Sequence, residues 1–205
     1  MKTEDIKVYL PKFLSAESNK ELFEGLQEFP NNLDTRIYTN FLTESDIIYQ
    51  GDAIKEMLVI NLPETKVKPV ASVVLSNTCD IDLQNERLYP SQIVYTPIIN
   101  LKKYRKLLYE KSKKSEEQID SHIYSIKKQE ITQIFYLPKF NGKLEESIIF
   151  FDRVCSCPNK SIERNNLTEK RIFTLSDYGA YLFLLKLSIH YTRIQDKVER
   201  RSVRI

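Results

Sequence analysis

The chain has 205 residues, of which 41% are apolar and 29% are charged, a composition typical of a globular domain. Its 31 basic and 28 acidic side chains leave a net charge of +3, too small by itself to indicate a nucleic-acid partner. No apolar run is long enough to cross a membrane, the residues after Met1 do not form a signal peptide, and three cysteines do not make a disulfide framework. We therefore expect a cytoplasmic protein of one domain, with no membrane partner and no cofactor.

Charge is distributed unevenly along the chain. Residues 1–50 carry nine acidic and five basic side chains, whereas residues 101–130 carry five acidic and nine basic ones. Residues 186–205 carry two acidic and six basic side chains. The two basic segments are suited to bind a phosphate backbone, but a solvated helix face and a basic tail explain the same pattern.

The first fifty residues predict a short helix and a short strand. Ser18 and Glu21 fit a capping box, in which each side chain satisfies a free backbone N–H, and an apolar stripe follows. This pattern predicts a helix over 18–28 that ends at Pro30. A short strand or extended segment is expected over 36–42.

A buried strand and a polar turn are predicted next. After the turn Gly51-Asp52, the run 70–75 is apolar except for Ser72, which predicts a central strand covered on both faces. The polar run 76–80 then forms a turn, and a further strand follows over 93–99.

The middle of the chain predicts helices followed by a hairpin. Apolar residues at helical spacing predict a helix over 101–111, which either persists or restarts up to Gln129. Asn141-Gly142 is a strong signal for a two-residue β-turn, and its flanks are rich in β-branched and aromatic residues. We therefore predict a long hairpin with arms over 131–140 and 143–154.

A last helix is expected to begin at Ser176 or Asp177. It is apolar almost all round between Tyr178 and Ile189, which indicates burial in the core or packing in an oligomer. Lys170-Arg171, in the loop before this helix, is interpreted as an ordinary solvated pair.

Seven segments follow one another in a recognisable order: Gly51-Asp52, Lys68-Pro69, Val70–Asn77, Ile93–Ile99, Glu146–Arg153, Lys170–Ile172 and Leu175–Asp177. This order resembles the MazF/PemK-type toxins, small barrels of the CcdB-like kind, many of which cut RNA. The family pattern is Gly-Asp, a strand, Arg-Pro with an apolar run and Ser-Asn, and a strand ending in Pro-Ile-Thr. A Ser-hydrophobic-Asp strand and a helix introduced by Leu-Ser follow. The match covers about half of the chain in two blocks.

The resemblance implies an α+β, mainly β fold. It would be an SH3-like or CcdB-like small β-barrel with a long β-hairpin, a helical insertion and a C-terminal helix. In one domain over 1–205, the barrel core would take 51–100 and 131–200, with 1–50 as an N-terminal extension and 101–130 as the insertion. The toxin barrels usually dimerise, so the resemblance also implies a homodimer.

Two positions depart from the catalytic members of this family. An Arg before the Pro and a Thr or Ser at the end of the second strand are thought to carry RNA cleavage there. Lys68 stands at the Arg position, and Ile99 or Asn100 at the Thr position. Lys lacks the planar fork that suits a phosphate, and Ile99 exchanges no proton. The resemblance therefore implies that cleavage has been lost or relocated.

The candidate site residues gather mainly around the polar run 76–80. In a relocated active site, Lys68 would hold a phosphate, and Thr78 or Asp80 would position or activate a ribose 2′-hydroxyl. Asn77 and Asp80 are equally suited to close a turn. The residues expected to contact nucleic acid are Lys68, Asn77, Arg153 and Arg193.

The cysteines offer an alternative in the form of a metal site. Cys79, Cys155 and Cys157 supply three thiols, and His190 or His122 would complete a tetrahedral zinc site. Their spacing fits neither a zinc ribbon nor a zinc finger, and free cysteines commonly act as small apolar residues. We therefore expect no metal.

Two classes of function remain open. In the first, the chain is a non-catalytic toxin-fold module that binds RNA or a protein partner, within a toxin–antitoxin or phage-defence system. In the second, it is a metal-independent endoribonuclease with a relocated active site. The missing Arg and Thr favour the first class, and the intact polar run keeps the second one open.

Overall fold

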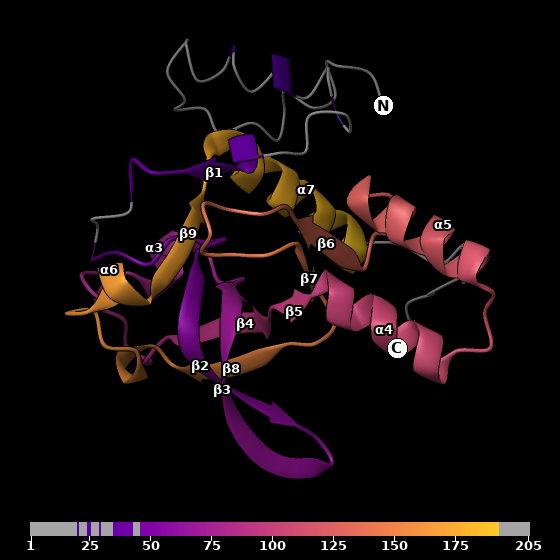
Figure 1. Ribbon diagram of the computed structural model, residues 1–205. Coiled ribbons are helices and arrows are strands. Elements are labelled where there is room, and N and C mark those ends of the chain that lie inside the picture. The colour runs from indigo at the N-terminus through magenta and orange to yellow at the C-terminus, as the bar shows by residue number, and fades with distance from the viewer. Residues whose placement is uncertain (1–19, 21–23, 26–28, 30–34, 43–45, 193–205) are drawn as a thin grey trace, which may run out of the picture.

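The computed structural model describes residues 20, 24–25, 29, 35–42 and 46–192, and it shows two antiparallel sheets flanked by helices (Figure 1). The strands are β1 (Tyr38–Thr39), β2 (Ala53–Asn61), β3 (Glu64–Val74), β4 (Gln92–Pro97), β5 (Ile99–Asn100), β6 (Ile134–Leu137), β7 (Ser147–Phe150), β8 (Cys155–Pro158) and β9 (Arg171–Leu175). The helices are α3 (Thr78–Ile81), α4 (Leu101–Lys111), α5 (Glu116–Lys127), α6 (Leu167–Lys170) and α7 (Asp177–Thr192), with 3₁₀ turns η2 (Thr35–Ile37) and η3 (Asn159–Ser161).

The larger sheet has the strand order β1-β9-β2-β3-β4-β8, and the smaller sheet has the order β5-β7-β6. The strand that follows Gly51-Asp52, β2, pairs with β9, the strand directly before the C-terminal helix. Among the described residues no ladder closes either sheet into a barrel. The α+β class is therefore confirmed and the small barrel stays a prediction. Helices and strands occupy similar shares of the described chain, so the fold is mixed rather than mainly β.

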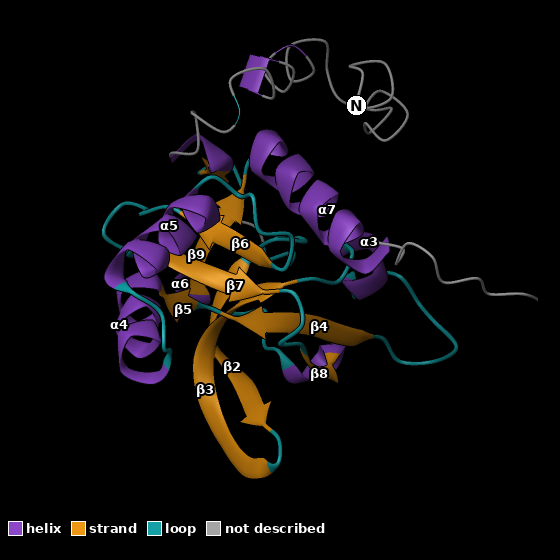
Figure 2. Ribbon diagram, turned by 90° about the vertical axis from the view of Figure 1, so that its right-hand side faces the viewer, coloured by secondary structure: helices purple, strands orange, loops and turns teal. Residues whose placement is uncertain are grey.

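The smaller sheet is buried on both faces. Helices α4 and α5 lie on one side of β6 and β7, and α7 lies on the other (Figure 2). Side chains alternate along each strand, so neighbouring residues enter different cores. The core on the α4–α5 side contains Leu101, Ile126, Ile134, Tyr136, Ile148 and Phe150. The core on the α7 side includes Phe135, Leu137, Ile149, Phe151, Leu182 and Phe183.

The predicted hairpin is confirmed, but its arms are shorter than expected. Asn141 and Gly142 have φ values of 41° and 68°, the left-handed conformation that a tight hairpin turn needs. Next to this turn a single bridge joins Phe140 to Leu144. Pro138 has no N–H to give to the ladder, and β6 ends directly before it.

Most of the other predicted elements are also confirmed. The run 70–75 covers the end of β3 and the next residue, and its residues 72–75 are buried. The helix predicted over 101–111 is confirmed as α4, and of the two alternatives for the residues up to Gln129 the restart holds, because Ser115 begins α5 with a new capping box. Ser176 caps α7 by accepting a hydrogen bond from the Gly179 N–H at 3.1 Å. Helix α7 packs into the core along one face through Tyr178, Tyr181, Leu182 and Phe183.

The N-terminal predictions are tested only in part. The segment 36–42 contains the end of η2 and the two-residue strand β1. The predicted helix over 18–28 lies largely outside the described residues. Within the described part of the chain, no helix combines the length and apolar character needed to cross a membrane.

A buried ion pair joins β2 to β9. The Arg171 Nε lies 3.1 Å from the Asp52 Oδ2, and both side chains are almost completely inaccessible to solvent. Asp52 Oδ2 also accepts from the Tyr49 N–H at 3.0 Å, and Arg171 Nη1 donates to the Leu42 carbonyl at 2.9 Å. Burial raises the pKa of Asp52, and the charge of Arg171 opposes that rise. The interpretation of Lys170-Arg171 as a solvated pair is therefore wrong for Arg171.

A second buried charge fixes α7 to the loop before β6. Lys186 Nζ donates to the Gln129 carbonyl and amide oxygens at 2.9 and 2.8 Å, and to the carbonyls of Ile131 and Ile134 at 2.9 and 2.6 Å. Burial lowers the pKa of Lys186 to about 7. No carboxylate is among these partners, so uncharged oxygens alone compensate the ammonium charge.

We predict that replacing Arg171 by Met lowers the free energy of unfolding by about 3–5 kcal/mol, because Asp52 stays buried without its cation. The double variant Asp52→Asn, Arg171→Met should be more stable than the single variant, since it leaves no unpaired charge. Urea denaturation of the three proteins measures both differences. A single variant as stable as the wild type would show that the pair does not hold the fold.

Lys186 should make stability depend on pH. Its pKa is lower in the folded state, so the unfolded chain holds more protons between about pH 7 and 10, and stability rises with pH there. The slope is at most about 1.4 kcal/mol per pH unit. Lys186→Met removes this contribution. The stability of the wild type relative to Lys186→Met, measured in urea between about pH 7 and 9, should therefore increase with pH. A constant difference would contradict the assignment.

Candidate functional site

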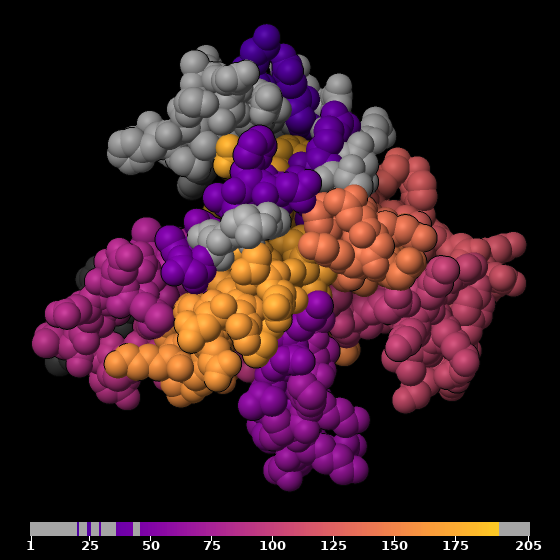
Figure 3. Space-filling view, turned by 60° about the vertical axis from the view of Figure 1, so that its left-hand side comes forward, coloured from indigo at the N-terminus to yellow at the C-terminus, as the bar shows by residue number. Residues whose placement is uncertain are grey.

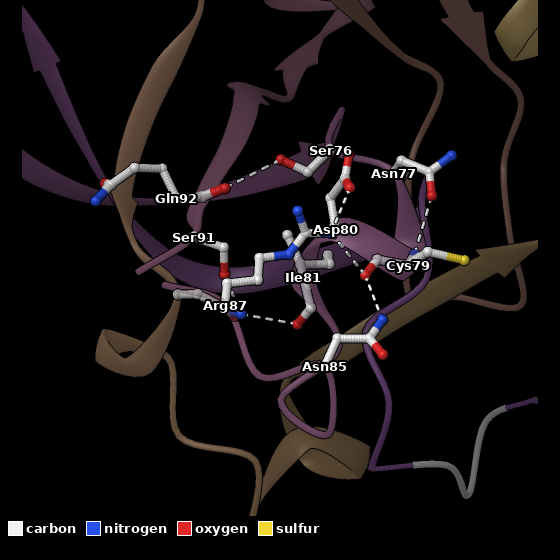
Figure 4. Close-up of polar contacts among 10 residues, drawn as sticks. Ser76, Asn77, Cys79, Asp80, Ile81, Asn85, Arg87, Ser91 and Gln92 are labelled. Carbon is white, nitrogen blue, oxygen red and sulfur yellow. Dashed lines mark hydrogen bonds and ion pairs between the residues drawn. The ribbon is translucent and has the colours of Figure 1, made fainter. Parts of the chain in front are cut away.

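The polar run 76–80 lies where β3 leaves the larger sheet and α3 begins (Figure 4). Ser76 Oγ accepts a hydrogen bond from the Val94 N–H at 2.8 Å, which fixes the run to β4. Asn77 is the N-cap of α3, and its Oδ1 accepts from the Cys79 N–H at 2.9 Å. Asn77 therefore has the turn-closing role that was the alternative to a functional one.

The two other candidate groups in this run already have partners within the chain. Thr78 Oγ1 accepts from the Gln50 N–H at 3.0 Å. Asp80 Oδ1 lies 2.7 Å from an Arg87 guanidinium nitrogen, in an exposed ion pair. Asn85 Nδ2 donates to the Cys79 carbonyl at 2.7 Å, so the loop after α3 folds back onto this helix (Figure 4). These contacts hold the α3 loop in place and leave neither Thr78 nor Asp80 unpaired.

Lys68 is not brought to this cluster. It is exposed on β3 opposite Val59, in the part of the strand that projects from the body of the molecule. Eight residues of extended chain separate Lys68 from Ser76, or roughly 26 Å along the strand. The predicted phosphate-holding residue therefore lies in the outer part of β3, whereas Thr78 and Asp80 lie beyond the other end of this strand. In β5, Ile99 pairs with Ile148, and the Asn100 side chain caps α4.

The charge of the α3 loop is unfavourable for RNA. Residues 78–91 carry three acidic side chains and one basic one, Arg87, so their net charge is −2. A phosphate backbone is repelled by such a surface, because affinity for nucleic acid depends on cationic groups near the phosphates.

Arg153 lies in a different environment, at the end of the smaller sheet. Its guanidinium carbon is 4.4 Å from the centre of the Phe150 ring, and the Phe150 and Tyr104 rings are 5.7 Å apart. The Tyr104 hydroxyl is 3.1 Å from His122 Nε2. Burial raises the pKa of Tyr104, and the charge of Arg153 opposes that rise. Burial also lowers the pKa of His122.

This aromatic and cationic group borders the most basic part of the described chain. Tyr104 and His122 belong to α4 and α5, which lie within the segment of nine basic and five acidic residues. Lys102 and Lys103 are exposed in the first turn of α4, and that turn contains no acidic residue. We refer to Lys102, Lys103, Tyr104, His122 and Arg153 as the insertion surface.

Sequence reasoning found Arg153 but missed its neighbours. In the sequence, His122 stands out only as a possible zinc ligand, and Tyr104 is one of the residues whose spacing predicts the helix over 101–111. The basic composition of 101–130 was a usable signal for this surface. No local pattern connects α4 and α5 to Arg153, which follows the second strand of the hairpin, so the grouping is visible only in the fold.

The cysteines lie in two different places. Cys155 and Cys157 are half-buried on the same face of β8, where they pack against the core beneath α3. Cys79 is exposed in α3, and the His190 ring lies 5.8 Å from that of Phe151. Over the described residues, no group of three or more His, Cys, Asp or Glu side chains is placed to hold a metal ion. Arg193 lies outside the described residues.

A cleft of about 290 Å³ was not anticipated from the sequence. It lies beside an irregularity in β2, where Glu56 has a positive φ of 61°. Its charged residues balance, since Lys55 and Lys170 oppose Glu56 and Glu163. Burial raises the pKa of the Tyr95 hydroxyl in this cleft to about 12. The cleft therefore favours neither an anionic nor a cationic ligand.

No family model and no curated protein sequence matches this chain. The resemblance to the MazF/PemK-type toxins therefore rests on the order of the sequence segments.

We predict that Asn77 is structural. Asn77→Ala should lower the free energy of unfolding by about 1 kcal/mol, because α3 loses its cap, whereas Asn77→Asp should retain most of the stability. Urea denaturation of both variants measures this difference. Equal stability of Asn77→Ala and the wild type would contradict the capping role.

Proposed function

We propose that this protein has a MazF/PemK-like toxin fold and binds single-stranded RNA without cleaving it. The observation that carries this proposal is the stacking of Arg153 on Phe150 beside Tyr104, at the border of a helical segment with an excess of four positive charges. Cations beside aromatic rings suit single strands, because the cations attract phosphates while the rings stack on bases. The insertion surface combines exposed cations with the half-buried rings of Tyr104 and His122, while Phe150 itself is buried.

The arrangement of the predicted catalytic groups favours binding over cleavage. Metal-independent cleavage needs a base and a charge stabiliser that converge on one ribose and its phosphate. Lys68 is distant along β3, Thr78 accepts a backbone hydrogen bond, and Asp80 is paired. The endoribonuclease alternative therefore gains no support from the geometry around the polar run.

The pairing of β2 with β9 supports the toxin-like fold. These strands bring together the two sequence blocks of the resemblance, one beginning at Gly51-Asp52 and the other ending at the C-terminal helix. Asp52 and Arg171, one residue from each block, form the buried ion pair. A small barrel, a homodimer and a role in a toxin–antitoxin or phage-defence system follow from the resemblance and belong to the same proposal.

RNA binding is tested by fluorescence anisotropy with a labelled single-stranded RNA. Arg153→Ala should weaken binding about tenfold, because it removes a phosphate contact and a stacking plane. It should also reduce the slope of log affinity against log salt by roughly 0.7. The matched control is Arg87→Ala, which removes an exposed arginine from the acidic α3 loop and should leave the affinity unchanged.

The same RNA, incubated with the wild-type protein in EDTA and separately with magnesium, should remain intact. Cleavage that is lost in Lys68→Ala or Asp80→Ala would overturn the non-catalytic proposal. No measurable affinity for RNA at low salt would overturn the RNA-binding proposal and leave a protein partner as the favoured class.

A further inference from the structure

Three sulfur-containing side chains belong to the core beneath α3. Cys155 and Cys157 are half-buried on one face of β8, and Met57 of β2 is buried in the same core. Met57 is the only methionine of the chain besides Met1, and it lines the cleft of about 290 Å³ together with Cys157. Thiolates and thioethers are the ligands that soft cations such as Cu(I) prefer.

The backbone of β2 is distorted where it brings Met57 to this core. Pairing between β2 and β3 shifts between Ile54 and Met57, and Glu56 has a φ of 61°, in the left-handed region that non-glycine residues rarely adopt. An irregularity of this kind changes the direction of the side chains next to it. Lys55 and Glu56 are both exposed and Met57 is buried, so the distortion ends by directing the thioether inward.

Tyr95 of β4 connects the cysteines with β2. It is directly opposite Cys155 in the ladder of β4 and β8, so its side chain shares a face with both cysteines. Its hydroxyl donates to the Leu58 carbonyl of β2 and interacts with the Cys157 thiol. Burial raises the pKa of Tyr95 to about 12, and the two cysteines add to this rise. Tyr95 therefore links the wall that carries Met57 to the wall that carries the thiols.

A fixed arginine lies near the thiols. Burial raises the pKa of Cys157, and the charge of Arg164 opposes that rise. The Arg164 guanidinium donates to the Ile162 carbonyl at 3.1 Å and to Asn159 Oδ1 at 2.6 Å, so it is held in place without a carboxylate among these two partners. Two thiolates that hold a monovalent cation carry one negative charge, and a guanidinium beside them compensates it.

The residues around the sulfur atoms disfavour other metal ions. The charged side chains of the cleft balance, and Glu56 is paired with Lys170 at 3.5 Å, so charge does not select the ligand. Mg²⁺ and Ca²⁺ need several oxygen ligands. Zn²⁺ needs four ligands, and over the described residues no group of three or more His, Cys, Asp or Glu side chains is placed to supply them. Two thiols and a thioether suit a soft ion with few ligands.

We propose that Cys155, Cys157 and Met57 bind one Cu(I) ion. The two thiols release their protons to solvent as two copper–sulfur bonds form, and the thioether is the third, weaker ligand. Residues two apart on a strand have Cα atoms roughly 6.6 Å apart, near the upper limit for a disulfide. An ion between the two sulfur atoms bridges this separation without drawing the backbone together.

The ion can reach the site from solvent. β8 is an edge strand of the larger sheet, and both of its cysteines are half-buried rather than enclosed. The cleft beside Cys157 lies between β2 and the segment 161–170, which ends in α6. Figure 3 shows the β2–β3 pair and this orange segment next to each other on one face of the molecule.

Competition with a chromogenic chelator tests the proposal. The full-length protein is added to Cu(I) held by bicinchoninate, with ascorbate and without oxygen, and the loss of colour measures the copper taken up. The wild type should bind one ion per chain. Cys155→Ser and Cys157→Ser should each weaken the affinity by at least about 100-fold, and Met57→Leu by about tenfold. The matched control is Cys79→Ser, which removes the exposed third cysteine and should leave the affinity unchanged.

A second variant and a second measurement protect the test against misfolding. Cys157→Ala keeps this position apolar and should lose Cu(I) as Cys157→Ser does. One equivalent of Cu(I) should raise the midpoint of thermal denaturation of the wild type and of Cys79→Ser, but not that of Cys157→Ala, because only a bound ion stabilises the folded state.

Three outcomes would overturn the proposal. The first is a wild type that takes no copper from the chelator. The second is copper uptake that is lost in Cys79→Ser or retained in both Cys155→Ser and Cys157→Ala, which would mean binding by the exposed cysteine only. The third is an affinity that Met57→Leu leaves unchanged, which would exclude the thioether and with it the three-sulfur site.

Discussion

The ion pair between Asp52 and Arg171 is the constraint on which the described fold depends. It joins residues 119 positions apart, at the start of β2 and the start of β9. It also draws in the segment before β2 through the Tyr49 N–H and the Leu42 carbonyl. Burying two charges is costly unless they are paired and hydrogen-bonded. Here Asp52 Oδ2 is paired with Arg171 and hydrogen-bonded to the Tyr49 N–H, whereas the buried Oδ1 has no hydrogen-bond partner among the described residues. A shifted register of β2 against β9 would lose the pair. The pair therefore specifies how the two halves of the larger sheet meet.

Lys186 fixes the smaller sheet to α7, just as the ion pair fixes β2 to β9 in the larger sheet. Three oxygens from the segment between α5 and β6, and the carbonyl of Ile134 at the start of β6, surround its ammonium group and fix this part of the chain to α7. The α4–α5 pair is attached to the same segment and covers the free face of β6 and β7. The helical insertion is thus an integral part of a core, and removing it would expose aromatic and aliphatic side chains of both strands. Its inner surface packs against both strands, and most of its basic side chains are exposed on the other side.

Local signals predicted most of the elements, whereas the site depended on contacts between distant segments. The turn at Asn141-Gly142, the cap at Ser176 and the buried run 70–75 each act within a few residues, so the sequence alone was sufficient to find them. Arg171 and Lys186 were missed as buried charges, because the groups that compensate them lie more than fifty residues away. The insertion surface was missed for the same reason, although the basic composition of 101–130 was visible from the start.

The position of Lys68 separates the expected phosphate-holding group from the polar run at the other end of β3. A strand can bring its two ends to one ligand only if it bends sharply or if another copy completes the site. Here Lys68 lies in the outer part of β3, and the other end of β3 leads into the polar run. The Asn77 and Thr78 side chains in that run already accept hydrogen bonds from backbone N–H groups. The charges support the same conclusion. The α3 loop is acidic, whereas the first turn of α4 contains Lys102 and Lys103 and no acidic residue. If RNA binds this fold, phosphate attraction therefore directs it to the insertion surface, where stacking and charge are combined and no general base is needed.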